Sequence, residues 1–406
     1  MADVAVLDVL LHGEPVGTLT RVGGERVLFA FNDAHAADEN RPLLGLGFKD
    51  RFGGLITDFR PTRNRLLPFF ANLLPEGHLR TYLARRAGVN PEREFFLLQA
   101  LGRDLPGAVT VRPADGGGWT ADTGGSDSGA EHGETALRFS LAGVQLKFSA
   151  LGGARGGLTI PATGAGGSWI VKLPSREFDG VPENEFSMMT LARLVGIDVP
   201  MFRLVGLDEI GNLPAGIGNL AGPAFAVERF DRLADGGAVH VEDFAQVFGI
   251  YPERKYSRGN ARAIAAVIGA EGQEADIAEF IRRLVFNTLI GNADMHLKNW
   301  SLIYPDRRHS ALAPAYDFVS TIPYIPDTGA ALTVSRTKRF DAFSRDELSH
   351  LAAKARLPEK PVLDTARETV ERFHEHWRRE KGNLPLRASV IAAIEAHLEI
   401  VPIARA

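Results

Sequence analysis

The segment Leu289–Trp300 carries the side chains of this sequence that are best suited to chemistry. Asp294 and Asn299 have the D-x-x-x-x-N spacing of a kinase catalytic loop, in which the aspartate takes the acceptor's proton and the asparagine binds Mg²⁺. Downstream, Asp317 begins Asp-Phe-Val and offers a second oxygen ligand for the same hard cation. A lone aspartate more often caps a helix, so the prediction of phosphoryl transfer rests on the combination.

A single lysine, Lys172, stands in the apolar run Ser168–Pro174. It matches the strand lysine that contacts nucleotide phosphates in kinases, although an edge-strand lysine that reaches solvent would give the same pattern. The helix that follows offers Glu183 and Glu185. Either could pair with Lys172, and either could be a first-turn carboxylate that the helix dipole favours. The sequence leaves this choice open.

Two further segments suit nucleotide binding. The loop Ser140–Lys147 contains Gly143, and backbone N–H groups near this glycine, with the Lys147 ammonium, could cradle phosphate. A plain hairpin explains the loop equally well. Glu228 and Phe230 follow a short apolar strand and would suit an adenine hinge, in which backbone groups read the base and the ring packs on it. An exposed turn is the alternative.

These residues need elements to position them. The runs Val4–Leu11, Glu14–Leu19 and Arg26–Phe31 predict an antiparallel β-meander at the start of the chain. Helical periodicity predicts a helix over Glu183–Val195, ended by Gly196, and mainly helices from Val241 onward. We expect a β-rich subdomain at 1–112, a Gly/Ser-rich linker or mobile insertion at 113–134, a nucleotide-binding part at 135–235 and a helical lobe at 236–406.

Composition excludes several classes of site. The 406 residues include no cysteine, so a disulfide framework, a thiolate metal site, an iron–sulfur centre and a cysteine nucleophile are all impossible. The 46 Lys+Arg and 50 Asp+Glu give a net charge of −4, which provides no footprint for direct non-specific binding to nucleic acid. No signal-peptide pattern and no long uncharged apolar run occur, so the expected compartment is the cytoplasm, without membrane contact.

Taken together, the motifs resemble the HipA family of bacterial serine/threonine kinases, the toxin half of HipBA toxin–antitoxin modules. Two N-terminal segments, Phe69–Glu76 and Leu101–Val109, are similar to that family's N-terminal subdomain. The remaining motifs that carry the resemblance are Phe139–Lys147, Ile170–Pro174, Val227–Asp231, Gly291–Asn299 and Tyr316–Ser320. The resemblance covers nearly the whole chain and implies an α+β, two-lobed kinase-like fold with a β-rich N-terminal lobe and an all-helical C-terminal lobe.

The resemblance also implies roles by position. Asp294 would be the catalytic base, His296 would support its loop, and Asn299 and Asp317 would bind Mg²⁺. Ser140 would be an autophosphorylation site whose modification switches the kinase off, since a dianion beside the nucleotide phosphates repels them. Asp231 would contact the ribose side of ATP. The implied nucleotide-binding set is Ser140, Gly143, Val144, Gln145, Lys147, Lys172, Glu228, Phe230, Asp231, His296 and Lys298.

The same resemblance implies partners. The substrate would be a protein, an aminoacyl-tRNA synthetase such as the glutamyl or tryptophanyl enzyme, whose phosphorylation stops translation and leads to growth arrest and persistence. A small helix-turn-helix antitoxin would silence the kinase and carry the complex to operator DNA. Two alternatives stay open: a small-molecule phosphotransferase of the same superfamily, because D-x-x-x-x-N also serves sugar and antibiotic kinases, and a non-catalytic regulator.

Overall fold

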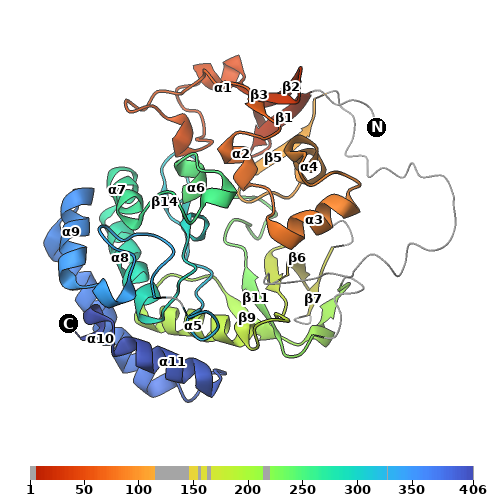
Figure 1. Ribbon diagram of the computed structural model, residues 1–406. Coiled ribbons are helices and arrows are strands. Elements are labelled where there is room, and N and C mark those ends of the chain that lie inside the picture. Colours follow the sequence, from red (N-terminus) through yellow and green to blue (C-terminus); the bar gives the residue numbers. More distant parts are fainter. Residues whose placement is uncertain are drawn as a thin grey trace.

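The computed structural model describes residues 6–114, 146–153, 157–161, 166–213, 220–326 and 328–405. In Figure 1 the N-terminal strands and helices lie at the top, a second sheet lies below them, and the C-terminal helices lie to the left. The active-site candidates come from the second sheet and from the helical part of the chain.

The N-terminal sheet is five-stranded, with the order β4-β3-β2-β1-β5. Its strands are β1 (Val6–Leu11), β2 (Glu14–Val22), β3 (Arg26–Phe31), β4 (Thr62–Arg63) and β5 (Val109–Pro113). The antiparallel β1–β2–β3 pairings confirm the predicted meander. The alternation of side chains along a strand explains why β1 forms, because it places Leu7, Val9 and Leu11 on one face, where all three are fully buried. The accompanying helices are α1 (Asp33–Ala37), α2 (Pro68–Asn72), α3 (Gly77–Arg86) and α4 (Glu94–Leu101).

The second sheet is six-stranded, with the order β10-β7-β6-β8-β11-β9. Its strands are β6 (Lys147–Gly152), β7 (Leu158–Thr159), β8 (Trp169–Lys172), β9 (Phe202–Val205), β10 (Ile210–Gly211) and β11 (Ala224–Glu228). Helix α5 (Val181–Val195) packs on β9 and β11 through buried residues that include Met188. Gly196 ends α5 at φ +96°, as predicted, and its N–H donates to the Ala192 carbonyl.

The C-terminal lobe is mainly helical. Its helices are α6 (Phe244–Val247), α7 (Ala261–Glu271), α8 (Glu274–Leu289), α9 (Arg345–Ala355), α10 (Glu359–Glu380) and α11 (Ala388–Leu398). Helices α8 and α10 pack closely. Phe286 and Phe373 are fully buried between them, with their ring centroids 5.9 Å apart. Because this core surrounds α8, it fixes the place where that helix ends and the catalytic loop begins.

One expectation about this lobe is wrong, because the lobe is not all-helical. It contains a three-stranded sheet of β12 (His240–Asp243), β13 (Ser301–Tyr304) and β14 (Ala311–Leu312). The segment from Val241, expected as helix, begins as a strand, and only α6 after it is helical. Strand β12 forms because it pairs with β13, a partner far along the chain that local periodicity does not reveal.

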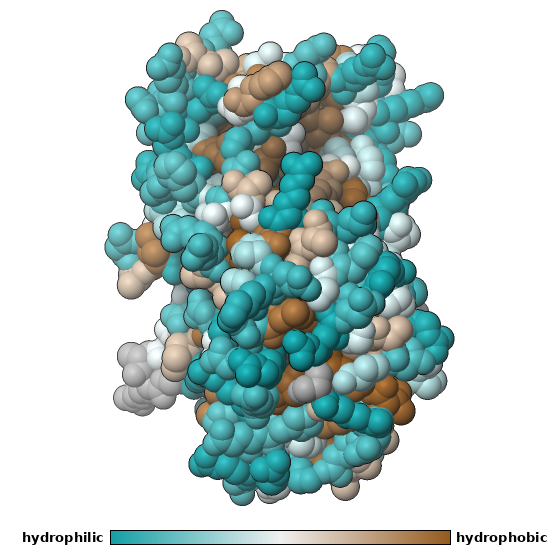
Figure 2. Space-filling view, turned by 90° about the vertical axis from the view of Figure 1, so that its left-hand side faces the viewer, coloured by the Kyte–Doolittle hydropathy of each residue, from teal (hydrophilic) through white to brown (hydrophobic). Residues whose placement is uncertain are grey.

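The outer surface on the side of the C-terminal helices is largely hydrophilic. Figure 2 shows this face with small apolar areas between polar side chains. None of the helices in the described ranges has the length and apolarity needed to cross a membrane.

Candidate active site

The turn after α8 presents Asp294. Gly291 adopts φ +65°, and the buried Asn292 side chain ties the turn together. Asn292 Nδ2 donates to Asn287 Oδ1 at 2.8 Å, and its Oδ1 accepts the Asp294 N–H at 3.0 Å. Asn299 Nδ2 donates to the Asp294 carbonyl at 3.0 Å. The fold therefore brings the two residues of the D-x-x-x-x-N pattern together and leaves the Asp294 side chain exposed at the end of a buried helix.

Asp317 lies beside this turn. Asn292 Nδ2 also reaches the Asp317 carbonyl at 3.4 Å, which links the catalytic loop to the segment that follows β14. Asp317 has φ +59°, a left-handed conformation that is uncommon for a residue with a side chain. Phe318 anchors the segment, because it is buried against Phe286 with ring centroids 5.1 Å apart. Two carboxylates and one amide of the predicted set thus meet at one place.

Lys172 forms the centre of a buried ion network. Its Nζ lies 2.6 Å from Glu185 Oε1 and contacts Asp317 Oδ1. The sequence left Glu183 and Glu185 as alternatives, and the structure selects Glu185, which is 1% exposed. Burial opposes the Lys172 charge, but Asp317 and Glu185 outweigh it and hold the pKa of Lys172 above its ordinary value. Burial also opposes the Asp317 charge, and Lys172 and Lys147 nevertheless lower the pKa of Asp317 to about 2.

Lys147 stands directly opposite Lys172 in the antiparallel register of β6 and β8. Like charges opposite each other in a sheet repel, so this pair of cations favours an anion between or above them. Although the residue keeps exposed surface, desolvation by the surrounding protein lowers the pKa of Lys147, with attraction by Asp317 opposing this shift and repulsion from Lys172 adding to it. Asp317 already contacts Lys172 as such an anion, and phosphate oxygens would supply further acceptors for the pair.

One of the two predicted hinge residues, Phe230, reaches the same region. Glu228 ends β11 with its side chain exposed, and its N–H donates to the Met201 carbonyl at 2.7 Å. Phe230 stacks on Tyr316, with centroids 5.8 Å apart and 30° between the rings. Since Tyr316 directly precedes Asp317, the hinge aromatic lies near the ion network. The sequence motif contained Tyr316 but assigned it no role.

Asp231 is directed elsewhere. It is 6% exposed and belongs to a buried cluster with Asp104, Arg229 and Arg232. Its Oδ1 accepts from Arg229 Nε at 3.0 Å, and its Oδ2 accepts from the Gly107 N–H at 2.8 Å. These contacts join the hinge to the N-terminal subdomain. The ribose contact implied by the resemblance stays a prediction, and the arginines compete with it for the same oxygens.

Lys298 and His296 lie on the inner side of the catalytic loop. Lys298 Nζ pairs with Glu76 Oε1 at 3.0 Å and donates to the Asn72 carbonyl at 2.9 Å, so it is held by the N-terminal subdomain. Burial, with repulsion from Lys255, lowers the pKa of His296 to about 3, which keeps the imidazole neutral near pH 7. Support of the loop by His296, and nucleotide contacts from either residue, stay predictions.

Two residues at this site were missed by sequence reasoning. Glu76 accepts from both Lys255 (2.8 Å) and Lys298 (3.0 Å), which lie on different segments of the helical lobe. Tyr256 donates its hydroxyl to Asp294 Oδ1 at 2.5 Å. Tyr256 lies in no recognised motif, whereas Glu76 ends the motif Phe69–Glu76, whose residues were assigned no part in the site.

Four predicted residues of the phosphate loop lie outside the described ranges: Ser140, Gly143, Val144 and Gln145. Their contacts with phosphate, and autophosphorylation at Ser140, stay predictions.

The donor set fits magnesium held partly by substrate. In the described ranges no group of three or more His, Cys, Asp or Glu side chains could hold a metal ion. Mg²⁺ typically takes one or two protein carboxylates and completes its shell with water and substrate phosphates. Asp317 offers one carboxylate, and Asn299 offers an amide oxygen, because its NH₂ already donates to the loop. Asp317 would exchange part of its Lys172 contact for the cation.

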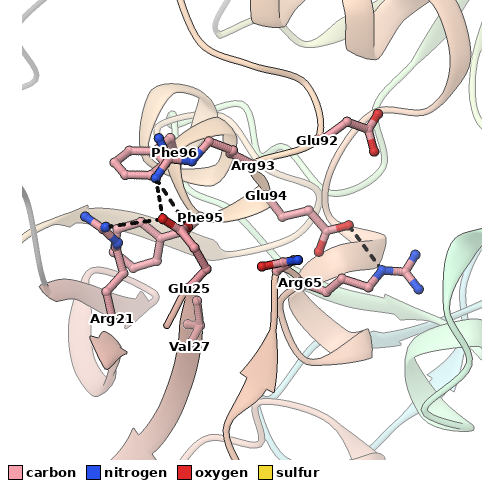
Figure 3. Close-up of a pocket in the computed structure, with 10 residues that line it drawn as sticks. Arg21, Glu25, Val27, Arg65, Glu92, Arg93, Glu94, Phe95 and Phe96 are labelled. Atoms are coloured by element: carbon pink, nitrogen blue, oxygen red, sulfur yellow. Dashed lines mark hydrogen bonds and ion pairs between the residues drawn. The ribbon is translucent and has the colours of Figure 1, made fainter. Parts of the chain in front are cut away.

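A separate pocket lies in the N-terminal subdomain, between β2, β3 and the start of α4 (Figure 3). Its charged side chains pair with one another, as Arg93 does with Glu25 at 3.0 Å. Arg93 also covers the Phe96 ring, 4.2 Å from its centroid. The pocket contains none of the residues described above and contributes nothing to the candidate active site.

Comparison with known proteins decides the family. The model of the HipA-like C-terminal domain matches residues 139–377, and that of the HipA N-terminal domain matches residues 7–112. The chain belongs to the HipA family. The resemblance found in the sequence is thus confirmed.

Individual relatives agree with this membership. Y4dM of Sinorhizobium fredii, a candidate kinase by name, is 61% identical over 408 residues, covering 100% of this chain and 99% of its own. The serine/threonine-protein kinase toxin HipA of Shewanella oneidensis is 27% identical over 298 residues and is covered to 65%, as is this chain. The solved complex of Shewanella oneidensis HipA with HipB and operator DNA matches at TM-score 0.72 and 21% identity, covering 98% of this chain and 99% of that one. The two-lobed, kinase-like α+β fold is confirmed.

Proposed function

We propose that this HipA-family chain is an ATP- and Mg²⁺-dependent protein serine/threonine kinase and the toxin of a toxin–antitoxin pair. The observation that carries the proposal is the convergence of Lys147 and Lys172 with Asp317 beside the Asp294–Asn299 loop. Two adjacent cations suit a polyphosphate, and the oxygen donors next to them suit the metal that accompanies it.

Each group then has a task in transfer. The lysines bind the phosphates, the stacked Phe230 and Tyr316 rings lie where a base could pack, and Asn299 and Asp317 would hold Mg²⁺, which neutralises charge on the transferring group. Asp294 receives the proton of the acceptor hydroxyl. The acceptor oxygen bonds to the γ-phosphorus, and the bond from that phosphorus to the bridging oxygen breaks, releasing ADP.

The biological setting follows from the family. The toxin HipA of Shewanella oneidensis, a relative, has a solved complex with HipB and operator DNA. We infer a small helix-turn-helix antitoxin as partner for this chain, with operator DNA bound mainly through that partner because the net charge here is −4. The protein substrate in this proposal is an aminoacyl-tRNA synthetase, with growth arrest as the outcome and autophosphorylation at Ser140 as the off-switch.

The test is phosphate transfer by the purified chain. With Mg²⁺ and γ-labelled ATP, we expect label in Ser140 or in a lysate protein, and none with Asp294→Asn. Asp306→Asn is the matched control, since this exposed carboxylate lies in the β13–β14 turn away from the catalytic loop. Full transfer by Asp294→Asn would remove Asp294 as the base. Transfer to a metabolite with no labelled protein would favour the small-molecule kinase instead.

A further inference from the structure

Tyr256 lies at the rim of the site, between the single turn Pro252–Arg254 and helix α7. Its hydroxyl donates to Asp294 Oδ1 at 2.5 Å. The ring meets His296 edge to face, with centroids 4.9 Å apart at 84°, and the residue is 49% exposed. A phenol hydroxyl therefore occupies one oxygen of the proposed catalytic base.

We propose that Tyr256 fills the acceptor position of the active site and that an incoming acceptor hydroxyl must displace it from Asp294. The inference rests on the proposed kinase function, in which Asp294 receives the acceptor's proton. A base must lie within hydrogen-bond distance of the hydroxyl that it deprotonates. Since Tyr256 already holds that relation to Asp294, a substrate hydroxyl and the phenol compete for one oxygen.

The surroundings allow the side chain to leave without refolding. The backbone beside it is fixed, because the Lys255 N–H donates to the Pro252 carbonyl and the Lys255 carbonyl accepts from the Leu297 N–H on the catalytic loop. The ring itself is half exposed and contacts one aromatic ring, His296. Rotation about the Tyr256 side-chain bonds is therefore enough to open Asp294.

Neighbouring charges hold the Tyr256 side chain in its position against Asp294. Lys255 Nζ lies 5.5 Å from the centroid of the Tyr256 ring and is itself fixed by Glu76 Oε2 at 2.8 Å. The ammonium thus attracts the ring face while the carboxylate of Asp294 attracts the hydroxyl. With no protein acceptor bound, Tyr256 would occupy the Asp294 oxygen that could otherwise accept a proton from water, and so limit wasteful hydrolysis of ATP.

The test uses water as the acceptor. In hydrolysis the water oxygen bonds to the γ-phosphorus, its proton passes to Asp294, and the bond to the bridging oxygen breaks to release ADP and phosphate. The purified full chain and Tyr256→Phe are compared with Mg-ATP alone, and kcat and KM are measured. We expect Tyr256→Phe to raise kcat about tenfold, comparable to one hydrogen bond to a charged acceptor. KM for ATP should stay unchanged, because Tyr256 contacts the base and not the lysine pair.

Tyr251→Phe is the matched control. It removes a hydroxyl that donates to the Leu66 carbonyl at 3.2 Å in the same segment, so it should leave hydrolysis as in the wild type. Adding Asp294→Asn to Tyr256→Phe should abolish the gain. If the wild type labels protein but Tyr256→Phe hydrolyses ATP no faster than the wild type, the role of Tyr256 is overturned while the kinase proposal stands. If no variant, the wild type included, transfers phosphate to any acceptor, the kinase proposal falls and this inference falls with it.

Discussion

Replacing Asp231 by asparagine tests whether this residue stabilises the fold or contacts the ribose of ATP. Its carboxylate accepts four hydrogen bonds: from Arg229 Nε (3.0 Å) and Nη2 (2.9 Å), Arg232 Nη1 (2.9 Å) and the Gly107 N–H (2.8 Å). The amide of Asp231→Asn would lose the charge and set an NH₂ group against donors. Removing one partner of a buried ion pair costs about 3–5 kcal/mol. Since Asp104 still pairs with both arginines, we expect about 3 kcal/mol.

The assay is urea unfolding followed by circular dichroism, together with ATP binding at a low urea concentration where the variant is folded. We expect the free energy of unfolding to fall by about 3 kcal/mol and the Kd for ATP to change less than about twofold. Asp235→Asn is the control, because this exposed carboxylate in the same loop accepts a local hydrogen bond from the Gly237 N–H, and the change should stay within about 0.5 kcal/mol. A stable Asp231→Asn protein that binds ATP tenfold more weakly would refute this reasoning and support the ribose contact.

Three further outcomes are expected. Glu185→Gln should lower phosphate transfer about tenfold by freeing Lys172, whereas Glu183→Gln should not, as measured by labelling rates. Asn299→Ala should raise the Mg²⁺ concentration for half-maximal transfer about tenfold, and EDTA should stop transfer in every variant. Although burial opposes it, the attraction of two lysines lowers the pKa of Glu76 from 4.5 to about 2, so its stabilising effect is complete above pH 4.5 and is lost as the pH falls towards 2. Glu76→Gln should therefore cost about 1–2 kcal/mol at pH 7, after allowance for its partial exposure, and progressively less below pH 4.5 in urea titrations.

The helices and strands that could be predicted are those whose pattern lies within their own segment of the sequence. Helix α8 and strand β11 were expected because apolar periodicity and short apolar runs are properties of the segment itself. Gly196 marked the end of α5 for a similar reason, since only a residue that tolerates positive φ suits that position. Strand β12 was missed because its hydrogen-bond partner, β13, is remote in sequence.

The site residues likewise fall into those that local sequence marks and those that depend on contacts remote in sequence. Asp294, Asn299, Asp317 and Lys172 belong to motifs whose spacing is readable, and the fold brings them together. The choice of Glu185 depended on which face of α5 meets β8, and a pattern alone did not decide it. Tyr256 meets Asp294 from 38 positions away, through a turn that carries no recognised motif.

The contacts of Glu76 make the N-terminal subdomain part of the active site. Lys255 and Lys298 come from the two segments that flank Asp294, and Glu76 accepts from both. Without this carboxylate, two ammonium groups would stand close together beside the base, and their mutual repulsion would drive the segments apart. Asp231 provides a second link by binding the Gly107 N–H behind the hinge. Because Lys255 precedes Tyr256 and Asp231 follows Phe230 along the chain, we expect a shift of the N-terminal subdomain to be transmitted to both aromatic side chains, which would couple acceptor access and base packing through one interface.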